Sequence, residues 1–212
     1  MKLKSLLFGQ VIRTAKISGP SGGSLYGVNL VKACEARYGF LQGPRLLNDF
    51  DPTKGITFLH GYFERRIVID RFQVYNNGLL AEAKADTDDC EQFLNDVMKW
   101  VTQEAGLTFD ESESRNFYTS HVEAEMDISL PEAFPKFSEF GQQIANAVRS
   151  YGHVIPDLAV YSFALASEPS TTFKIERREG TGSDSRTFFC TSPLRTSDQI
   201  KLLEVAEKLF HS

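Results

Sequence analysis

The sequence predicts an α+β fold: two related α-β-β-β-α modules with antiparallel strands, in a pseudo-two-fold arrangement, with helices flanking the sheet. Apolar residues recur at helical spacing in separate stretches of each half, and strand-like runs lie between those stretches. The order of these stretches is the same in both halves, as in an internal repeat. At 212 residues, 42% of them hydrophobic, the chain can bury a core without disulfides.

The first part of the chain predicts one helix and leaves one segment open. Residues 1–17 fit either a strand or a short amphipathic segment, and the Gly- and Ser-rich stretch 18–24 is typical of a linker or tight turn. A helix is predicted over residues 25–38 from its apolar spacing, and Gly39 is placed to end it. Residues 43–55 are predicted to form a loop.

Strand patterns follow over residues 56–63, 65–75 and 78–85. Asn76-Asn77 before Gly78 indicates a hairpin with a type I′ turn, whose two central residues need positive φ. The apolar alternation changes phase at Asp70-Arg71, which predicts a β-bulge in the middle of the second strand.

The next helix has a clear amphipathic pattern and begins with a run of acidic residues. Asp86 or Thr87 is predicted as its N-cap, and Asp88 and Asp89 fall in the first turn, where the helix dipole favours anions. A cation site at these aspartates is the alternative. Capping is favoured because the corresponding helix start in the second half keeps a capping side chain but loses the other acids. The apolar stripe of this helix consists of Cys90, Phe93, Leu94, Val97, Met98 and Val101, and Gly106 is placed to end it.

The second half begins with a strand pattern over residues 117–130, whose apolar residues alternate from Val122 to Leu130. A helix is predicted over residues 131–151, ended by Gly152. The remaining predicted elements are strands over 158–166, 171–178 and 186–191, followed by a helix over 197–210.

The two halves therefore repeat one element order, over residues 25–105 and 131–211. Asp89 and Asp198 lie at matching places in the two closing helices, 109 positions apart (198 − 89). A duplication or pseudo-symmetric domain explains this, and independent convergence on a common α+β arrangement is the alternative. The predicted organisation is an N-terminal segment and linker over 1–23, a first module over 24–110 and a second over 111–212, packed as one unit.

Composition excludes several classes of protein. Cys34, Cys90 and Cys190 are widely spaced and form no CxxC, which favours buried thiols in a reducing compartment over disulfides or a zinc site. No stretch is apolar enough for a membrane span and no clear secretion signal is present, so a soluble, cytoplasmic protein is expected. The net charge of −5 disfavours a broad non-specific nucleic-acid binder.

Basic residues in the two hairpin regions are the first candidate binding set. If the halves are symmetric, these arginines could form one positive stripe interleaved with aromatic rings, as on sheets that bind single-stranded nucleic acid. Alternatively, they are strand charges balanced by neighbouring carboxylates. As a nucleic-acid or partner-binding set they are Arg65, Arg66, Arg71, Arg177, Arg178 and Arg186.

A second candidate lies on the strand that opens the second half. His121, Glu123 and Glu125 alternate, so their side chains share one face and offer ligands to a divalent metal. The alternative is the solvated face of a half-buried strand. No catalytic triad or cofactor motif is present, so no catalytic residue is assigned and no cofactor is expected.

The sequence thus favours a non-enzymatic protein-interaction or assembly component of a larger complex, with a protein partner or a homo-oligomer expected. The absence of a catalytic signature, the 17 Phe residues and the sheet edges available for docking support this reading. A nucleic-acid-binding module using the arginine set is the first alternative. A metal-dependent hydrolase using the His121 strand is the second.

Overall fold

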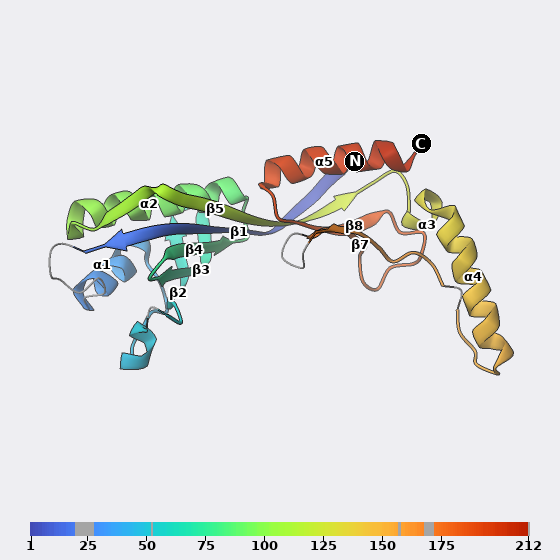
Figure 1. The fold of residues 1–212 in the computed structure, drawn as a ribbon, viewed down its shortest axis with the longest axis horizontal. Coiled ribbons are helices and arrows are strands. Elements are labelled where there is room, and N and C mark those ends of the chain that lie inside the picture. The colour runs from blue at the N-terminus through green and yellow to red at the C-terminus, as the bar shows by residue number, and fades with distance from the viewer. Residues whose placement is uncertain (20–27, 52, 157, 168–171, 212) are drawn as a thin grey trace. The chain divides into compact units, whose positions relative to one another are not determined.

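The computed structural model describes residues 1–19, 28–51, 53–156, 158–167 and 172–211. The chain is a mixed α/β protein with antiparallel pairing between its strands, which confirms the predicted class. In chain order, the elements are β1 (Lys2–Ser18), α1 (Val28–Tyr38), the 3₁₀ helix η1 (Leu47–Phe50), β2 (Ile56–Phe63), β3 (Ile67–Tyr75), β4 (Gly78–Ala83), α2 (Thr87–Ala105), β5 (Thr108–Glu125), α3 (Leu130–Ala133), α4 (Pro135–Ser150), β6 (Ser162–Ala166), β7 (Thr172–Arg177), β8 (Thr187–Ser192) and α5 (Thr196–Phe210) (Figure 1).

The chain divides into two compact units. Unit A contains Leu7–Ser120 and Leu194–Thr196, and unit B contains Met1–Leu6, His121–Pro193 and Ser197–Ser212. The strand order is β2-β3-β4-β1-β5 in unit A and β1-β5-β8-β7-β6 in unit B, and β1 and β5 run from one unit into the other. The predicted modules, residues 24–110 and 111–212, were defined by the repeated element order, and their bounds differ from those of units A and B. The division into these modules stays a prediction.

Each half runs from a long strand through a helical segment and three strands to a closing helix, but the helical segment is α1 and η1 in the first half and α3 and α4 in the second. The segment 1–17, which the sequence leaves open, is part of strand β1, because its buried residues alternate from Val11 to Ile17. The bulge predicted at Asp70-Arg71 is present, since the pairing of β3 with β4 shifts register between Ile69 and Arg71.

The turn chemistry differs from the prediction. Tyr75 pairs with Gly78 in the expected hairpin, but Asn76 and Asn77 do not adopt the positive φ that a type I′ turn needs. Gly78 is needed for a different reason, because a Cβ there would collide with the carbonyl oxygen of Arg13 on β1. A turn whose two central residues both have positive φ lies instead between β2 and β3, at Glu64 and Arg65, with Arg66 as the third residue of the connection.

The long helix predicted over 131–151 is two helices. Phe134, between α3 and α4, has φ −128° and ψ 62°, because the residue before a proline is disfavoured in the helical conformation and Pro135 follows it. Gly152, with φ 86°, ends α4 as predicted.

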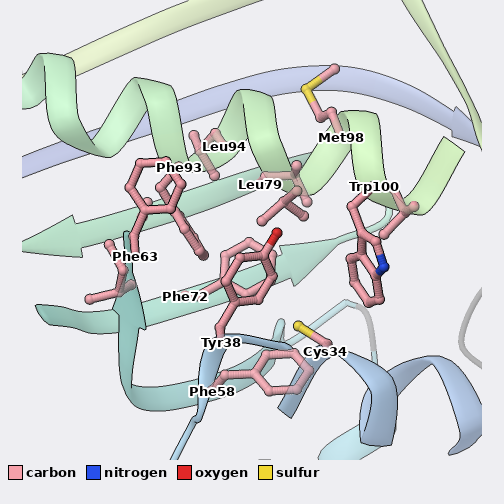
Figure 2. Packing of buried hydrophobic residues seen from close by; sticks show 14 of the residues in the cluster. Cys34, Tyr38, Phe58, Phe63, Phe72, Leu79, Phe93, Leu94, Met98 and Trp100 are labelled. Carbon is pink, nitrogen blue, oxygen red and sulfur yellow. The ribbon is translucent and has the colours of Figure 1, made fainter. Parts of the chain in front are cut away.

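The core of unit A lies between its sheet and the helices α1 and α2. Phe93 on α2 makes edge-to-face contacts with Tyr38 and Phe72, at centroid distances of 5.0 and 5.2 Å, and Figure 2 shows these rings converging from three elements. Beside them is an apolar cavity of about 60 Å³, whose lining includes Cys34 and Trp100. The smaller core of unit B gathers Val122, Met126, Ile175, Phe188 and Leu203.

Among the helices of the described residues, none has the length and apolarity needed to cross a membrane.

Candidate docking surface and the predicted site residues

The arginines predicted in the first half lie on two different features of unit A. Arg71 on β3 forms an ion pair with Glu82 on β4, in which Nε lies 2.6 Å from Oε2. Glu82 is only 9% exposed, and this hydrogen bond raises the pKa of the Arg71 guanidinium. Arg65 and Arg66 belong to the β2–β3 turn, where Arg66 lies 3.1 Å from the carboxylate of Glu64.

The arginines predicted in the second half also have partners in unit B. Arg178 donates to Glu123 at 2.9 Å, and Arg186 donates to Glu132 at 3.3 Å. Arg177 lies over the ring of Tyr161, 5.3 Å from its centroid. Arg177 is the last residue of β7, and Arg178 follows it outside the strand.

Pairing with carboxylates reduces the positive charge that this set can offer to a polyanion. Three of the six arginines lie in unit A and three in unit B, so the single stripe that the sequence allows stays a prediction.

The carboxylates of the His121 strand are engaged with other side chains. Glu123 accepts from Ser5 at 3.0 Å as well as from Arg178, and Glu125 accepts from Lys4 at 3.0 Å. Burial lowers the pKa of the half-buried His121. Within the described ranges, no group of three or more His, Cys, Asp or Glu side chains is placed to hold a metal ion, so this geometry gives the metal hypothesis no support.

The aspartates at the start of α2 have structural partners. Asp86 is the N-cap, and its carboxylate accepts from the backbone N–H of Asp89 at 2.7 Å, which confirms the capping interpretation. Asp88 accepts from Arg195 at 2.7 Å. The run of acids is therefore the start of a helix.

The three cysteines are free and buried, as predicted. Burial and, after it, the carboxylates of Asp89 and Asp86 raise the pKa of the Cys90 thiol to about 12. A thiol near a helix N-terminus is usually acidified, but here desolvation and two carboxylates oppose the helix dipole.

A polar network that the sequence does not reveal joins α2 to the long strands of unit A. Arg13, which is 8% exposed, donates to Asn116 at 2.8 Å and lies 3.4 Å from Glu91. Asn116 in turn donates to Glu91 at 2.8 Å, and Arg195 lies over the ring of Tyr118. In the sequence, the only sign of this network is Arg13, a charged residue at a position where the alternation of β1 places a buried side chain.

A reciprocal contact links the two helix starts. The N–H of Thr87 donates to Oγ1 of Thr196 at 3.1 Å, and the N–H of Thr196 donates to Oγ1 of Thr87 at 3.0 Å. These threonines are 109 positions apart, which is the same offset that relates Asp89 to Asp198 in the sequence.

An exposed apolar surface of unit B lies on α4. Exposed apolar residues at helical spacing line one face of α4, and this row, the α4 stripe, is defined as Phe137 (68% exposed), Phe140 (58%), Ile144 (39%) and, two turns further at the C-cap, Tyr151 (78%). Figure 1 shows α4 extending away from the strands of unit B. Aromatic side chains this exposed and this close together are typical of protein interfaces.

Only one side of the apolar arc of α4 is covered. Gly141 and Ala145, the buried residues of the helix, lie beside the α4 stripe. A Cβ at Gly141 would collide with the carbonyl oxygen of Leu158, and the guanidinium of Arg149 donates to the carbonyl oxygen of Ile155 at 2.9 and 3.1 Å. The chain after α4 therefore returns along the small residues and leaves the aromatic ones exposed.

The sequence could have revealed this surface. Apolar residues at both the Phe137–Phe140–Ile144 and the Gly141–Ala145 positions make an arc wider than one neighbouring segment can cover.

Comparisons with known proteins add little. No protein-family model matches the sequence, and no curated protein matches it. Among solved structures, the chain is similar to a Methanococcus jannaschii protein titled TBP, with 12% identity and a TM-score of 0.49 over 100% of this chain and 99% of that one. A likeness of this degree carries no conclusion about what this protein does.

Proposed function

We propose that this protein is a non-enzymatic interaction component that docks a protein partner on the α4 stripe. The observation that carries the proposal is a row of aromatic side chains on one helix face, left uncovered within the described part of unit B. Aromatic residues dominate the energetics of protein interfaces, because burying one Phe contributes about 1.5–3 kcal/mol. The docking mode that fits is a partner groove that receives anchors at i, i+3 and i+7.

The decisive comparison is between two triple variants of α4. In the stripe variant, Phe137, Phe140 and Ile144 become Ser; in the matched control, the exposed residues Gln142, Gln143 and Asn146 become Ser. Each tagged protein is purified from the native host at mild salt, co-purifying proteins are identified by mass spectrometry, and the partner is then titrated as a pure protein. The proposal predicts at least a tenfold weaker Kd for the stripe variant only. Equal recovery and equal Kd with both variants would refute it.

The nucleic-acid alternative can be tested on the same material. A single-stranded oligonucleotide titrated at low salt should bind with a strong salt dependence that an Arg66→Ala/Arg177→Ala variant loses. The ion pair of Arg66 and the ring contact of Arg177 lead us to expect little binding. The metal-hydrolase alternative requires a divalent ion to raise the melting temperature, and this increase should be absent from the Glu123→Ala/Glu125→Ala variant.

A further inference from the structure

Of the two edge strands of the sheet, β2 and β6, only β2 is protected from pairing with another chain. The outer edge of β2 is covered, because Leu59 and Gln42 exchange backbone hydrogen bonds of 2.8 and 3.3 Å. His60 in the same strand has φ 56°, which bends that edge. Covering and bending are both devices that prevent a sheet edge from pairing with another chain.

The edge strand β6 has neither device. Its residues 162–166 pair with β7 without a register shift, and no described strand pairs with its other side. Its sequence, SFALA, contains no charge and no proline, and every residue except Phe163 is exposed. The largest of these exposed side chains, Leu165, is 61% exposed. A straight, uncharged and exposed edge of this kind is a template for strand addition.

The hydrogen-bond pattern shows which residues of β6 point outward. The N–H of Arg177 donates to the carbonyl oxygen of Tyr161 at 3.0 Å, so Tyr161 and Arg177 form a hydrogen-bonded pair of the antiparallel ladder. Because such pairs alternate along a strand, Phe163 and Leu165 also direct their backbone groups to β7. The N–H and C=O groups of Ser162, Ala164 and Ala166 therefore point away from the sheet.

We propose that β6 pairs antiparallel with β6 of a second copy of this chain, about a two-fold axis at Ala164. Three residues point outward, and the middle one is Ala164, so this register pairs Ala164 with its own copy and Ser162 with Ala166 of the second copy. It sets Phe163 against Leu165 of the second copy, on the face where Phe163 stacks on Phe134 at 5.6 Å. Since β6 carries no charge, no like charges meet across the axis.

A second copy fits this edge because the strand is complementary to itself, and two-fold dimers are the commonest symmetric assemblies. The proposal is independent of the α4 stripe and of the partner proposed for it. We therefore expect the triple variant with Ser in place of Phe137, Phe140 and Ile144 to dimerise like the wild type.

The test is the mass of the full chain in solution as a function of concentration, by sedimentation or light scattering. Ala164→Pro removes an outward N–H without removing a hydrogen bond to β7, and proline is tolerated on an edge strand with that geometry. It should weaken dimerisation at least tenfold, whereas the control Ala164→Ser, which keeps the N–H, should dimerise like the wild type. Circular dichroism confirms that each variant is folded.

A second variant protects the test if the proline disturbs folding. In Ala164→Glu, the new carboxylate lies opposite Lys174 on β7, so the folded monomer keeps a favourable charge pair. In the dimer, the same substitution sets two carboxylates against each other at the two-fold axis. Its dimer should be weak at low salt and recover at high salt, unlike that of the proline variant. A wild type that is monomeric at millimolar concentration, or a dimer that neither Ala164→Pro nor Ala164→Glu weakens, would overturn the proposal.

Discussion

Individual side chains decide the difference between a functional cluster and a structural one in this protein. The aspartates that open α2 look like a cation site in the sequence, but Asp86 caps the helix and Asp88 pairs with Arg195. Capping could be predicted because both helix starts share it. The pairing could not, because Arg195 follows Asp88 by more than a hundred residues and only the fold brings them together.

The cap has a measurable contribution to stability. Asp86→Ala removes the acceptor for the Asp89 N–H and should lower the free energy of unfolding by about 1 kcal/mol, whereas Asp86→Asn should lower it by only a few tenths. Urea denaturation of the two variants measures the difference. Equal losses, or a wild type stabilised by Mg²⁺ or Ca²⁺, would favour the cation site instead.

His121 should make stability depend on pH in the acidic range. Burial lowers its pKa in the folded protein below the usual value of about 6.5. Between the two pKa values the unfolded chain binds more protons, so the free energy of unfolding falls as pH decreases through 6.5 towards the folded pKa. A His121→Gln variant should lose part of the decrease in melting temperature on acidification, while Gln in place of the exposed His153 should leave the profile like that of the wild type.

The thiols should be inert until the protein unfolds. Burial raises the pKa of Cys90 and of Cys190 to about 12, so almost no thiolate is present at pH 8. A colourimetric thiol reagent should react slowly with the native protein, and with all the cysteines at once in denaturant. Fast labelling of one cysteine in the native protein would contradict the burial of that thiol.

At the scale of elements, periodicity predicted most helices and strands, and turn chemistry was the weaker guide. Asn-Asn-Gly marked the correct hairpin but not its turn type, because Gly78 is required by the close approach of β1. The turn with positive φ at Glu64 and Arg65 gives no composition signal, since both residues are unfavourable there.

That turn is a site for stabilisation. The double substitution Glu64→Asn/Arg65→Gly places favourable residues at φ values of 50° and 58° and should raise the free energy of unfolding by about 1 kcal/mol. The matched control is Asn77→Gly in the β3–β4 turn, where φ is not positive and Gly should destabilise instead. Thermal unfolding measures both, and a destabilised double variant would mean that the Arg66–Glu64 ion pair outweighs the backbone strain.

At the scale of the whole chain, the sequence predicts the class and the element order but not every docking surface. The similar element order of the two halves was visible in the sequence, and the duplication that would explain it stays a prediction. The long strand β1 was one of two alternatives that the sequence left open, the other being a short amphipathic segment, because many of its residues are exposed or only partly buried. The wide apolar arc of α4 is a sign of the α4 stripe that the sequence does carry. The open edge of β6 depends on what does not pack against it, which no local pattern in the sequence records.

The cavity beside Trp100 has a consequence for the volume of the protein. The space of about 60 Å³ is lined by apolar side chains, which favour its staying empty of water, and it disappears when unit A unfolds. The unfolded state is therefore smaller than the native state by an amount on the order of tens of mL/mol, and hydrostatic pressure should favour it. High-pressure fluorescence of Trp100 should show unfolding at lower pressure in the wild type than in a Val97→Leu variant, in which the added methylene occupies the cavity.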